Sequence, residues 1–418
     1  MSLPLHQQSL SLNHAAFAKT LSTCENLLII QDLDGVCMGL VNDPLTRQID
    51  PGYIEATRAF DPHFYVLTNG EHIGRRGVNR IVERAFEGDK ATLQAQNSYL
   101  PGLAAGGVQW QQRNGQGSHP GVSEAELAFL KTVPQQIEDC LRAFFSSHPC
   151  PAELSQNLDN HVAGAILDNI ASPSANLNNL YSLLHTDTDT FVALQKTMRS
   201  HFEEMLTQAT EQGLEDSFFI HYAPNLGRDA TGKEIVWIGD TEQSGTTDFQ
   251  FMLRGAIKEA GVLALLNYYY FRRSGSHPLG KDFNARQASF SVDELVKLAK
   301  DAFDPELMPT VVGVGDTVTS QKREGQIKRG GSDRNFLQLI QDLNEPFDSG
   351  NLTVYVDSSG GELKNRQPLK ITKLDGVETV VKGPGDEADP LKLNVAFPGG
   401  HEQYCQVFAA AARDRLTH

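Results

Sequence analysis

Four short apolar runs along the chain each stop at a polar or glycine-containing turn. They span residues 27–30, 64–67, 310–314 and 352–356. Runs that are apolar at nearly every position are typical of strands buried on both faces, as in parallel sheets covered by helices. Polar groups that follow such strands gather at the carboxyl edge of the sheet, where ligands bind. The pattern therefore predicts an α/β fold built on one parallel sheet with a shared site.

Apolar residues at helical spacing predict helices around these strands. One helix is predicted over residues 292–303, where Ser291 and Glu294 have the S-x-x-E spacing of a capping box. A second is predicted over residues 336–343, and a closing helix over residues 401–414. Helices that alternate with buried strands indicate a doubly wound sheet.

The chain of 418 residues is too long for one hydrophobic core. Residues 71–275 follow the second strand, and a loop of that length would be exceptional. They are therefore predicted to form a separate domain, inserted into a core made of residues 1–70 and 276–418. Helices are expected at residues 123–130 and 247–266 of the insertion.

The composition excludes several classes of protein. A formal net charge of −16 argues against a nucleic-acid partner, because binding to phosphate backbones requires clustered Lys and Arg. No apolar run approaches the roughly 20 residues of a membrane span, and the polar first residues do not resemble a signal peptide, so a cytoplasmic protein is expected. Five scattered cysteines without a C-x-x-C pair predict neither disulfides nor a zinc site. An anionic substrate would need local positive charge from a metal ion or a few basic residues.

The most informative polar group is the pair Asp32 and Asp34, which follows the first strand and precedes Gly35. Two carboxylates at a strand end converge on one small volume. One can attack phosphorus while the other carries a proton, and together they suit Mg²⁺. Taken alone, the D-x-D-G segment is more often an ordinary turn.

Two further side chains occupy equivalent positions after other strands. Thr68 ends the second strand and offers a hydroxyl and an amide to phosphate oxygens, and Asp316 ends the third strand and offers a carboxylate to a metal. Each alone could be a turn or capping residue. Their occurrence in this order, each at a strand end, favours a phosphate and metal site.

A second Gly-Asp-Thr segment offers an alternative to Asp316. Asp240 also follows a short apolar stretch, residues 235–239. If Asp240 belonged to the metal site, the long remainder of the chain would have no place in the sheet. Asp316 is therefore preferred, because it leaves one helix, one strand and a closing tail. Asp240 is then expected on the substrate-facing side of the insertion.

Asp32 to Gly35, Thr68 and Gly315 to Thr317 resemble motifs one, two and four of haloacid-dehalogenase-type phosphatases. The resemblance implies a Rossmann-like doubly wound core, and it makes residues 71–275 a large C2-type α+β cap domain.

The same resemblance implies a role for each motif residue. Asp32 would be the nucleophile that forms an aspartyl-phosphate, and Asp34 would protonate the leaving oxygen and then activate water. Thr68 would bind the transferring phosphate. Asp316 would hold Mg²⁺ together with Asp32 and the main-chain carbonyl of Asp34. By position alone, the neighbours Asn69 and Gly70 are expected near the substrate.

Two parts of the family pattern are ambiguous in this sequence. The lysine of motif three is assigned to Lys281, which precedes the helix that leads to the third strand. The second acid of the metal site is assigned to Asp333, with a simple helix N-cap as the alternative. It follows a basic, glycine-rich stretch, residues 322–331, which either supplies positive charge to the site or forms a solvated loop.

The segments Gln31 to Cys37 and Val66 to His72 carry a closer resemblance, to the salt-tolerance branch of these phosphatases. It implies a glycosyl phosphomonoester substrate from compatible-solute synthesis and a possible association with the synthase that makes it. Two alternatives stay open. One is a phosphatase for sucrose, trehalose or mannosylglycerate phosphate. The other is a catalytically silent regulatory protein, which would be favoured by the fourth motif, where no acid follows Asp316 within the next five residues.

Overall fold

The computed structural model describes residues 3–417 except 42–43, 75, 149, 185, 224, 229–232, 241–243, 324–325, 363–365 and 375. The chain divides into two compact units. Unit 1 contains Met1–His72, Gly77–Gly121 and Gly255–His418, and unit 2 contains Ile73–Arg76 and Val122–Arg254. The insertion is therefore shorter than the expected residues 71–275, because residues 77–121 and 255–275 add three strands and three α-helices to unit 1.

An eight-stranded sheet forms the centre of unit 1, in the order β18-β15-β12-β1-β2-β3-β4-β5. The strands are β1 (Leu27–Gln31), β2 (Phe64–Leu67), β3 (Gly102–Ala104), β4 (Gln109–Gln111), β5 (Gly117–Ser118), β12 (Thr310–Gly315), β15 (Leu352–Val356) and β18 (Val395–Phe397). Strands β18 to β3 run parallel, and β4 and β5 run antiparallel at one edge. The four predicted strands are β1, β2, β12 and β15, and their predicted parallel sheet is confirmed.

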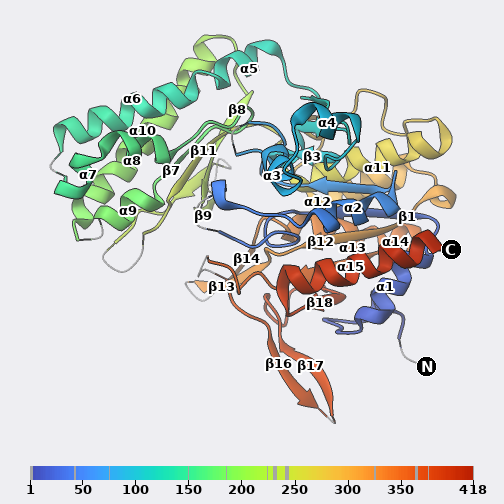
Figure 1. The fold of residues 1–418 in the computed structure, drawn as a ribbon. Coiled ribbons are helices and arrows are strands. Elements are labelled where there is room, and N and C mark those ends of the chain that lie inside the picture. The colour runs from blue at the N-terminus through green and yellow to red at the C-terminus, as the bar shows by residue number, and fades with distance from the viewer. Residues whose placement is uncertain are drawn as a thin grey trace. The chain divides into compact units, whose positions relative to one another are not determined.

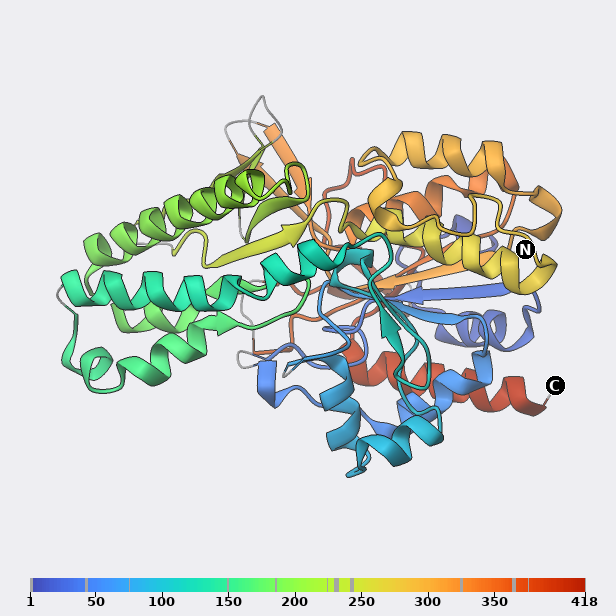
Figure 2. The ribbon, with the colours of Figure 1, turned by 90° about the horizontal axis from the view of Figure 1, so that it is seen from above.

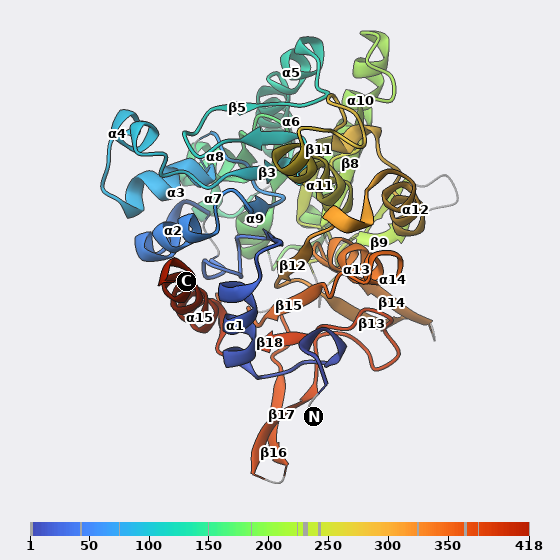
Figure 3. The same cartoon turned by 90° about the vertical axis from the view of Figure 1, so that its right-hand side faces the viewer.

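Helices cover both faces of this sheet because alternate residues of its strands point in opposite directions. Leu27 and Ile29 join one core and Leu28 and Ile30 the other. The first core contains α1 (His14–Thr23), α2 (Pro51–Thr57), α3 (Val78–Ala85), α4 (Lys90–Ala95) and α15 (Gly400–Thr417). The second contains α11 (Lys258–Ser274), α12 (Val292–Ala302), α13 (Arg334–Asp342) and α14 (Asn344–Phe347). Figure 3 shows α1 and α15 on one side of β15 and β18 and α13 on the other.

The predicted helices of unit 1 are present as α12, α13 and α15, but one detail is wrong. Ser291 does not cap α12 with its side chain, and Glu294 instead accepts a hydrogen bond from the Ser289 hydroxyl. A capping box does form in unit 2, between Ser123 and Glu126, at the start of the predicted helix over residues 123–130.

Unit 2 has an antiparallel sheet with one face covered by helices. Its strands are β6 (Ile166–Leu167), β7 (Ser174–Asn176), β11 (Asp248–Leu253) and β8 (Phe218–Ala223), in that order, with the hairpin β9 (Asn225–Arg228) and β10 (Glu234–Val236) beside it. Its helices are α5 (Glu124–Leu130), α6 (Val133–Ser147), α7 (Ala152–Gln156), α8 (Leu158–Ala165), α9 (Asn178–Leu184) and α10 (Thr188–Glu211), and the long helices α6 and α10 run side by side (Figure 2). The helix predicted over residues 247–266 is wrong in its first half, which is strand β11.

Two further hairpins belong to unit 1. They are β13 (Thr319–Arg323) with β14 (Gln326–Gly330), and β16 (Lys370–Leu374) with β17 (Val377–Lys382), which projects away from the sheet (Figure 1). Short 3-10 helices occur at Leu5–Gln7, Pro44–Thr46, Arg58–Phe60, Ala105–Gly107, Ala285–Gln287 and Pro305–Leu307. Among the described residues, no helix combines the length and hydropathy needed to cross a membrane.

Candidate active site

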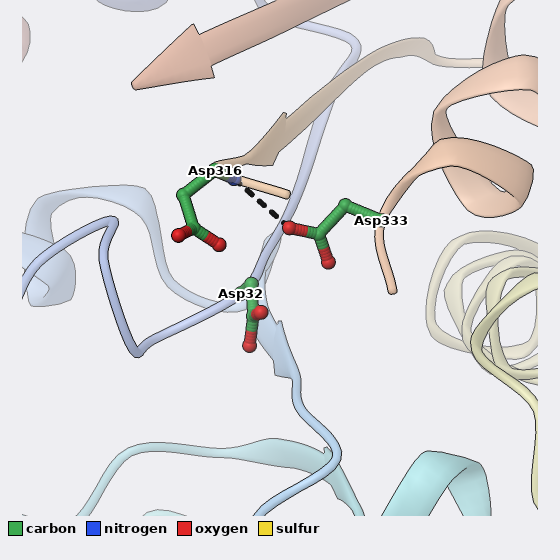
Figure 4. A group of neighbouring side chains, drawn as sticks. All are labelled: Asp32, Asp316 and Asp333. Atoms are coloured by element: carbon green, nitrogen blue, oxygen red, sulfur yellow. Dashed lines mark hydrogen bonds between the residues drawn. The ribbon is translucent and has the colours of Figure 1, made fainter. Parts of the chain in front are cut away.

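Three buried carboxylates meet at the carboxyl edge of the unit 1 sheet (Figure 4). Asp32 follows β1, Asp316 follows β12, and Asp333 stands at the start of α13. Each offers an oxygen atom, and these atoms all lie within 4.8 Å of one another. The arrangement follows from the parallel pairing of β1 with β12, which brings the ends of both strands together.

Lys258 joins two of these carboxylates. Its Nζ lies 2.7 Å from Asp32 Oδ2 and 2.6 Å from Asp333 Oδ1, and its side chain is 2% exposed. Burial alone would lower the pKa of Lys258, but the two carboxylates hold it above its ordinary value, so the lysine stays charged. The assignment of Lys281 to this place is therefore wrong. Lys281 is exposed and lines a cavity that contains none of the three aspartates.

Asp333 is held entirely by groups of the protein. Besides the bond to Lys258, its Oδ2 accepts hydrogen bonds from the backbone N–H groups of Asp316 and Thr317, at 2.9 and 3.0 Å. Burial opposes ionisation, but Lys258 and these amides outweigh it and lower the pKa of Asp333. Its side chain does not cap α13. Asp333 therefore fixes the lysine and the turn after β12 as an ionised carboxylate.

Asp316 has one oxygen that the protein leaves unbonded. Its Oδ1 accepts a hydrogen bond from the Thr317 hydroxyl at 2.6 Å, whereas its buried Oδ2 accepts none from the described residues. Gly35 leaves room for this oxygen, because a β-carbon at position 35 would lie 2.2 Å from Oδ2 and the backbone there has a φ of +77°. Burial, with the negative charges of Asp333 and Asp32, raises the pKa of Asp316 to about 8.

The positive charge beside Asp32 does not fully compensate the burial of its carboxylate. Its Oδ1 accepts a hydrogen bond from Leu33 N at 2.8 Å, and Lys258 contacts Oδ2. Burial raises the pKa of Asp32 to about 7 despite the lysine. Two buried carboxylates with raised pKa values, one with an unbonded oxygen, are a donor set that a hard divalent cation fits. Asp32 and Asp316 could hold such an ion directly, with Asp333 behind them.

Asp34 lies on the solvent side of this cluster. Its side chain is 26% exposed, and its Oδ1 is 2.9 Å from Nε of Arg47. The backbone carbonyl of Arg47 in turn accepts a hydrogen bond from Arg84 at 2.9 Å. An accessible carboxylate two residues after a buried one is suited to proton exchange with a bound molecule.

Thr68 ends β2, the other neighbour of β1, and is buried. Its hydroxyl accepts a hydrogen bond from Gly70 N at 3.1 Å, and its backbone N–H donates to Leu103 O at 3.1 Å. Asn69 between them is exposed. The structure thus places Thr68, Asn69 and Gly70 at the same sheet edge as Asp32.

The basic hairpin does not supply positive charge through Arg329. This side chain pairs with Asp386, with Nε 2.8 Å and Nη2 2.9 Å from its carboxylate oxygens. The side chains of Lys322, Arg323 and Lys328 lie outside the described residues.

An arginine that sequence analysis missed stands beside the metal-site carboxylate. Arg366 donates from Nη2 to the Thr317 hydroxyl at 3.1 Å, and its Nε lies 3.8 Å from Asp316 Oδ2. It follows β15 in an irregular segment without a motif, so nothing in the sequence distinguishes it from a loop arginine.

A buried amide network supports the strand that carries Asp32. The hydroxyls of Tyr53 and Tyr404 donate to Gln31 Oε1 at 2.7 and 2.9 Å, and Gln31 Nε2 donates to Asp32 O at 3.3 Å. Tyr404 comes from α15 and Tyr53 from α2, so two helices fix the end of β1. In the sequence, the signal for this network is Gln31 itself, a polar residue at the end of an otherwise apolar strand.

The alternative metal residue Asp240 lies in unit 2, where it is exposed and directly precedes residues 241–243, which lie outside the described residues. The carboxylates that the structure brings to Asp32 are Asp316 and Asp333.

Comparisons with known proteins identify relatives of the whole chain. Residues 26–412 match the family described as glucosylglycerol-phosphate phosphatase. A glucosylglycerol-phosphate phosphatase of Synechocystis sp. is 57% identical over 99% of this chain and 99% of its own length. Two solved structures from Candida albicans are more distantly similar. The C-terminal domain of a trehalose synthase regulatory protein has a TM-score of 0.47 at 12% identity, covering 96% of this chain and 99% of that one. The C-terminal domain of a trehalose-6-phosphate phosphatase has 0.44 at 9%, covering 97% and 99%.

Replacing Lys258 with Met should destabilise the protein, because Asp32 and Asp333 would be left buried without a cation. We expect a loss of about 3–5 kcal/mol in the free energy of unfolding, measured by urea denaturation. The matched control is Lys281→Met, an exposed site where the change should stay within about 0.5 kcal/mol. Equal losses in both variants would contradict the buried ion pairs.

Proposed function

The chain belongs to the glucosylglycerol-phosphate phosphatase family, and we propose that it hydrolyses glucosylglycerol 3-phosphate to glucosylglycerol and phosphate. The reaction would release a compatible solute under salt stress and take place in the cytoplasm. The observation that supports it most strongly is the buried cluster in which Lys258 bridges Asp32 and Asp333 beside Asp316. Such a cluster provides a positive charge that can stabilise a phosphoryl group and negative charges that can bind a cation.

In the first step, a carboxylate oxygen of Asp32 attacks the phosphorus atom. The bond between phosphorus and the glycerol oxygen breaks, and Asp34 donates a proton to that oxygen, so neutral glucosylglycerol leaves. An aspartyl-phosphate remains on Asp32. The partial exposure of Asp34 fits this role, because the leaving group must approach from the solvent side.

In the second step, Asp34 is a carboxylate and takes a proton from a water molecule. The water oxygen attacks phosphorus, the bond between phosphorus and Asp32 breaks, and phosphate is released. Asp32 is again ionised and Asp34 again protonated, which completes the cycle. Lys258 stays bonded to Asp32 and Asp333 and holds the nucleophile in place. Thr68, with Asn69 and Gly70, would position the phosphoryl oxygens at the end of β2.

We propose that the cation is Mg²⁺, which Asp32, Asp316 and the main-chain carbonyl of Asp34 would hold, with Asp333 as the second acid behind them. When bound, Mg²⁺ neutralises charge on the phosphoryl group. The charges of the site support this assignment. Among the described residues, the carboxylates of Asp32, Asp34, Asp316 and Asp333 outnumber the cations of Lys258, Arg47 and Arg366, and a divalent cation would offset this difference where a phosphate dianion must bind.

Unit 2 would act as the cap that selects the glycosyl part of the substrate. Its sheet buries Phe249 and Phe251 on the helix side, whereas Asp248, Gln250 and His221 lie on the other face. Polar side chains on one face of a sheet are suited to sugar hydroxyls. Association with the synthase that makes the phosphorylated precursor remains a further proposal.

The substrate can be tested by phosphate release in Mg²⁺. We expect glucosylglycerol 3-phosphate to be hydrolysed with a higher kcat/KM than sucrose, trehalose or mannosylglycerate phosphates, and Asp32→Asn to reduce turnover by about 10⁴-fold or more. Preference for another glycosyl phosphate would change the substrate assignment. No release from any of them would favour a silent regulatory protein.

The affinity for Mg²⁺ should depend on pH, because protons compete for Asp32 and Asp316. Their pKa values of about 7 and about 8 mean that acid keeps the carboxyls protonated. The apparent Kd in isothermal titration calorimetry should therefore fall as pH rises through this range, by about tenfold per pH unit for each proton displaced, and level off above it. Asp316→Asn should abolish most of the binding. Equal affinity at pH values below and above this range would contradict a site built on these carboxylates.

Arg47 and Arg366 should contribute to binding of the phosphate group. Replacing either with Gln removes positive charge beside Asp34 or Asp316, and we expect KM to rise about 10- to 100-fold in steady-state assays. Arg329→Gln is the matched control, because its partner is Asp386, and it should leave KM unchanged. A higher KM only in the control would show that the hairpin provides the positive charge.

A further inference from the structure

A cavity of about 550 Å³ lies in unit 1, apart from the aspartate cluster. It is bordered by α11 and by residues of β3, β4 and β5, and α11 lies beside β3 in Figure 1 and Figure 3. Its walls include Trp110, Ala264, Tyr268, His277, Lys281 and Gln287. A cavity of this size can enclose a small molecule, and nothing in the proposed reaction uses it.

The segment that forms the outer wall is fixed in place. Asn267 of α11 accepts a hydrogen bond from Leu279 N and donates one to Gly280 O, both at 2.9 Å. His277 stacks on Phe271 with ring centroids 4.2 Å apart. The cavity is therefore preformed, which reduces the entropy that a ligand must overcome on binding.

Two aromatic side chains form an apolar wall. The rings of Trp110 and Tyr268 meet edge to face with centroids 5.0 Å apart, and both residues are partly exposed. Trp and Tyr combine a flat apolar surface with a polar tip. Such a wall suits the C–H face of a pyranose ring.

Polar groups around this wall have unused hydrogen-bonding capacity. The Tyr268 hydroxyl, the Lys281 ammonium group and the Gln287 amide make no hydrogen bond or ion pair among the described residues. The buried Nδ1 of His277 also has no partner there. Asp282 lies next to Lys281 and lines the same cavity, so the positive charge is balanced. Mixed donors and acceptors without net charge match hydroxyl groups better than phosphate.

We propose that this cavity is a second, non-catalytic site that binds a neutral glycoside. The ligand is assigned to glucosylglycerol, so this inference rests on the proposed function, which makes that glycoside the product. The aromatic wall would take the sugar ring, and Lys281 and Gln287 would bond its hydroxyls.

Trp110 makes the site directly measurable. The chain has 2 tryptophans, Trp110 and Trp237, so a Trp237→Phe variant reports on the cavity alone. We expect glucosylglycerol to change its emission in a saturable way. Adding Lys281→Met and Gln287→Leu should weaken the apparent affinity about tenfold or more, whereas Lys297→Met, an exposed lysine on α12, should leave it unchanged. Inorganic phosphate should have no effect.

Three results would overturn the site. They are no saturable change with glucosylglycerol, an unchanged affinity in the Lys281→Met, Gln287→Leu variant, or saturation by inorganic phosphate instead. Phosphate release from glucosylglycerol 3-phosphate by the same Trp237→Phe protein separates the two proposals. Release without binding contradicts only the second site, and binding without release contradicts only the proposed reaction.

Discussion

The buried ammonium group of Lys258 is the interaction on which the site depends. Removing a charge from water costs several kcal/mol unless partners compensate it. Here Asp32 and Asp333 do so, and each of these carboxylates would itself be costly without the lysine. The contacts also join three chain segments, the end of β1, the start of α11 and the start of α13. The same contacts of Lys258 therefore fix the positions of these segments and balance the charges of Asp32 and Asp333.

Asp316 stands in the same edge under a different constraint. Its Oδ2 lies against Gly35, where a β-carbon would come within 2.2 Å of it, and none of the described residues donates a hydrogen bond to it. The fold thus places the carboxylate of Asp316 where the missing side chain of Gly35 leaves room for it. The position of the Asp316 carboxylate therefore depends on the glycine at position 35, because a side chain there would displace it.

The central strands and the carboxylates after them could be predicted because each strand is mainly apolar and ends at a recognisable turn. Lys258 could not. It stands with Glu259 just before the apolar run at residues 260–266, and the single helix predicted over residues 247–266 concealed both strand β11 and the helix start. Arg47 and Arg366 lie in irregular segments, where sequence spacing carries no information about contacts. The unit boundary was misplaced because β3, β4 and β5 are too short to show a strand pattern.

The pairing of β1 with β12 has a consequence for biosynthesis. Most of unit 2 comes from one continuous stretch, Val122–Arg254, so it can collapse soon after it leaves the ribosome. The nucleophile strand β1 is made first but must wait for β12, and β15 and β18 emerge later still. During that interval, β1 lacks one of its two neighbouring strands, and an unpaired apolar edge is prone to aggregation. We therefore expect the nascent chain to need protection of the free edge of β1 until β12 has been made.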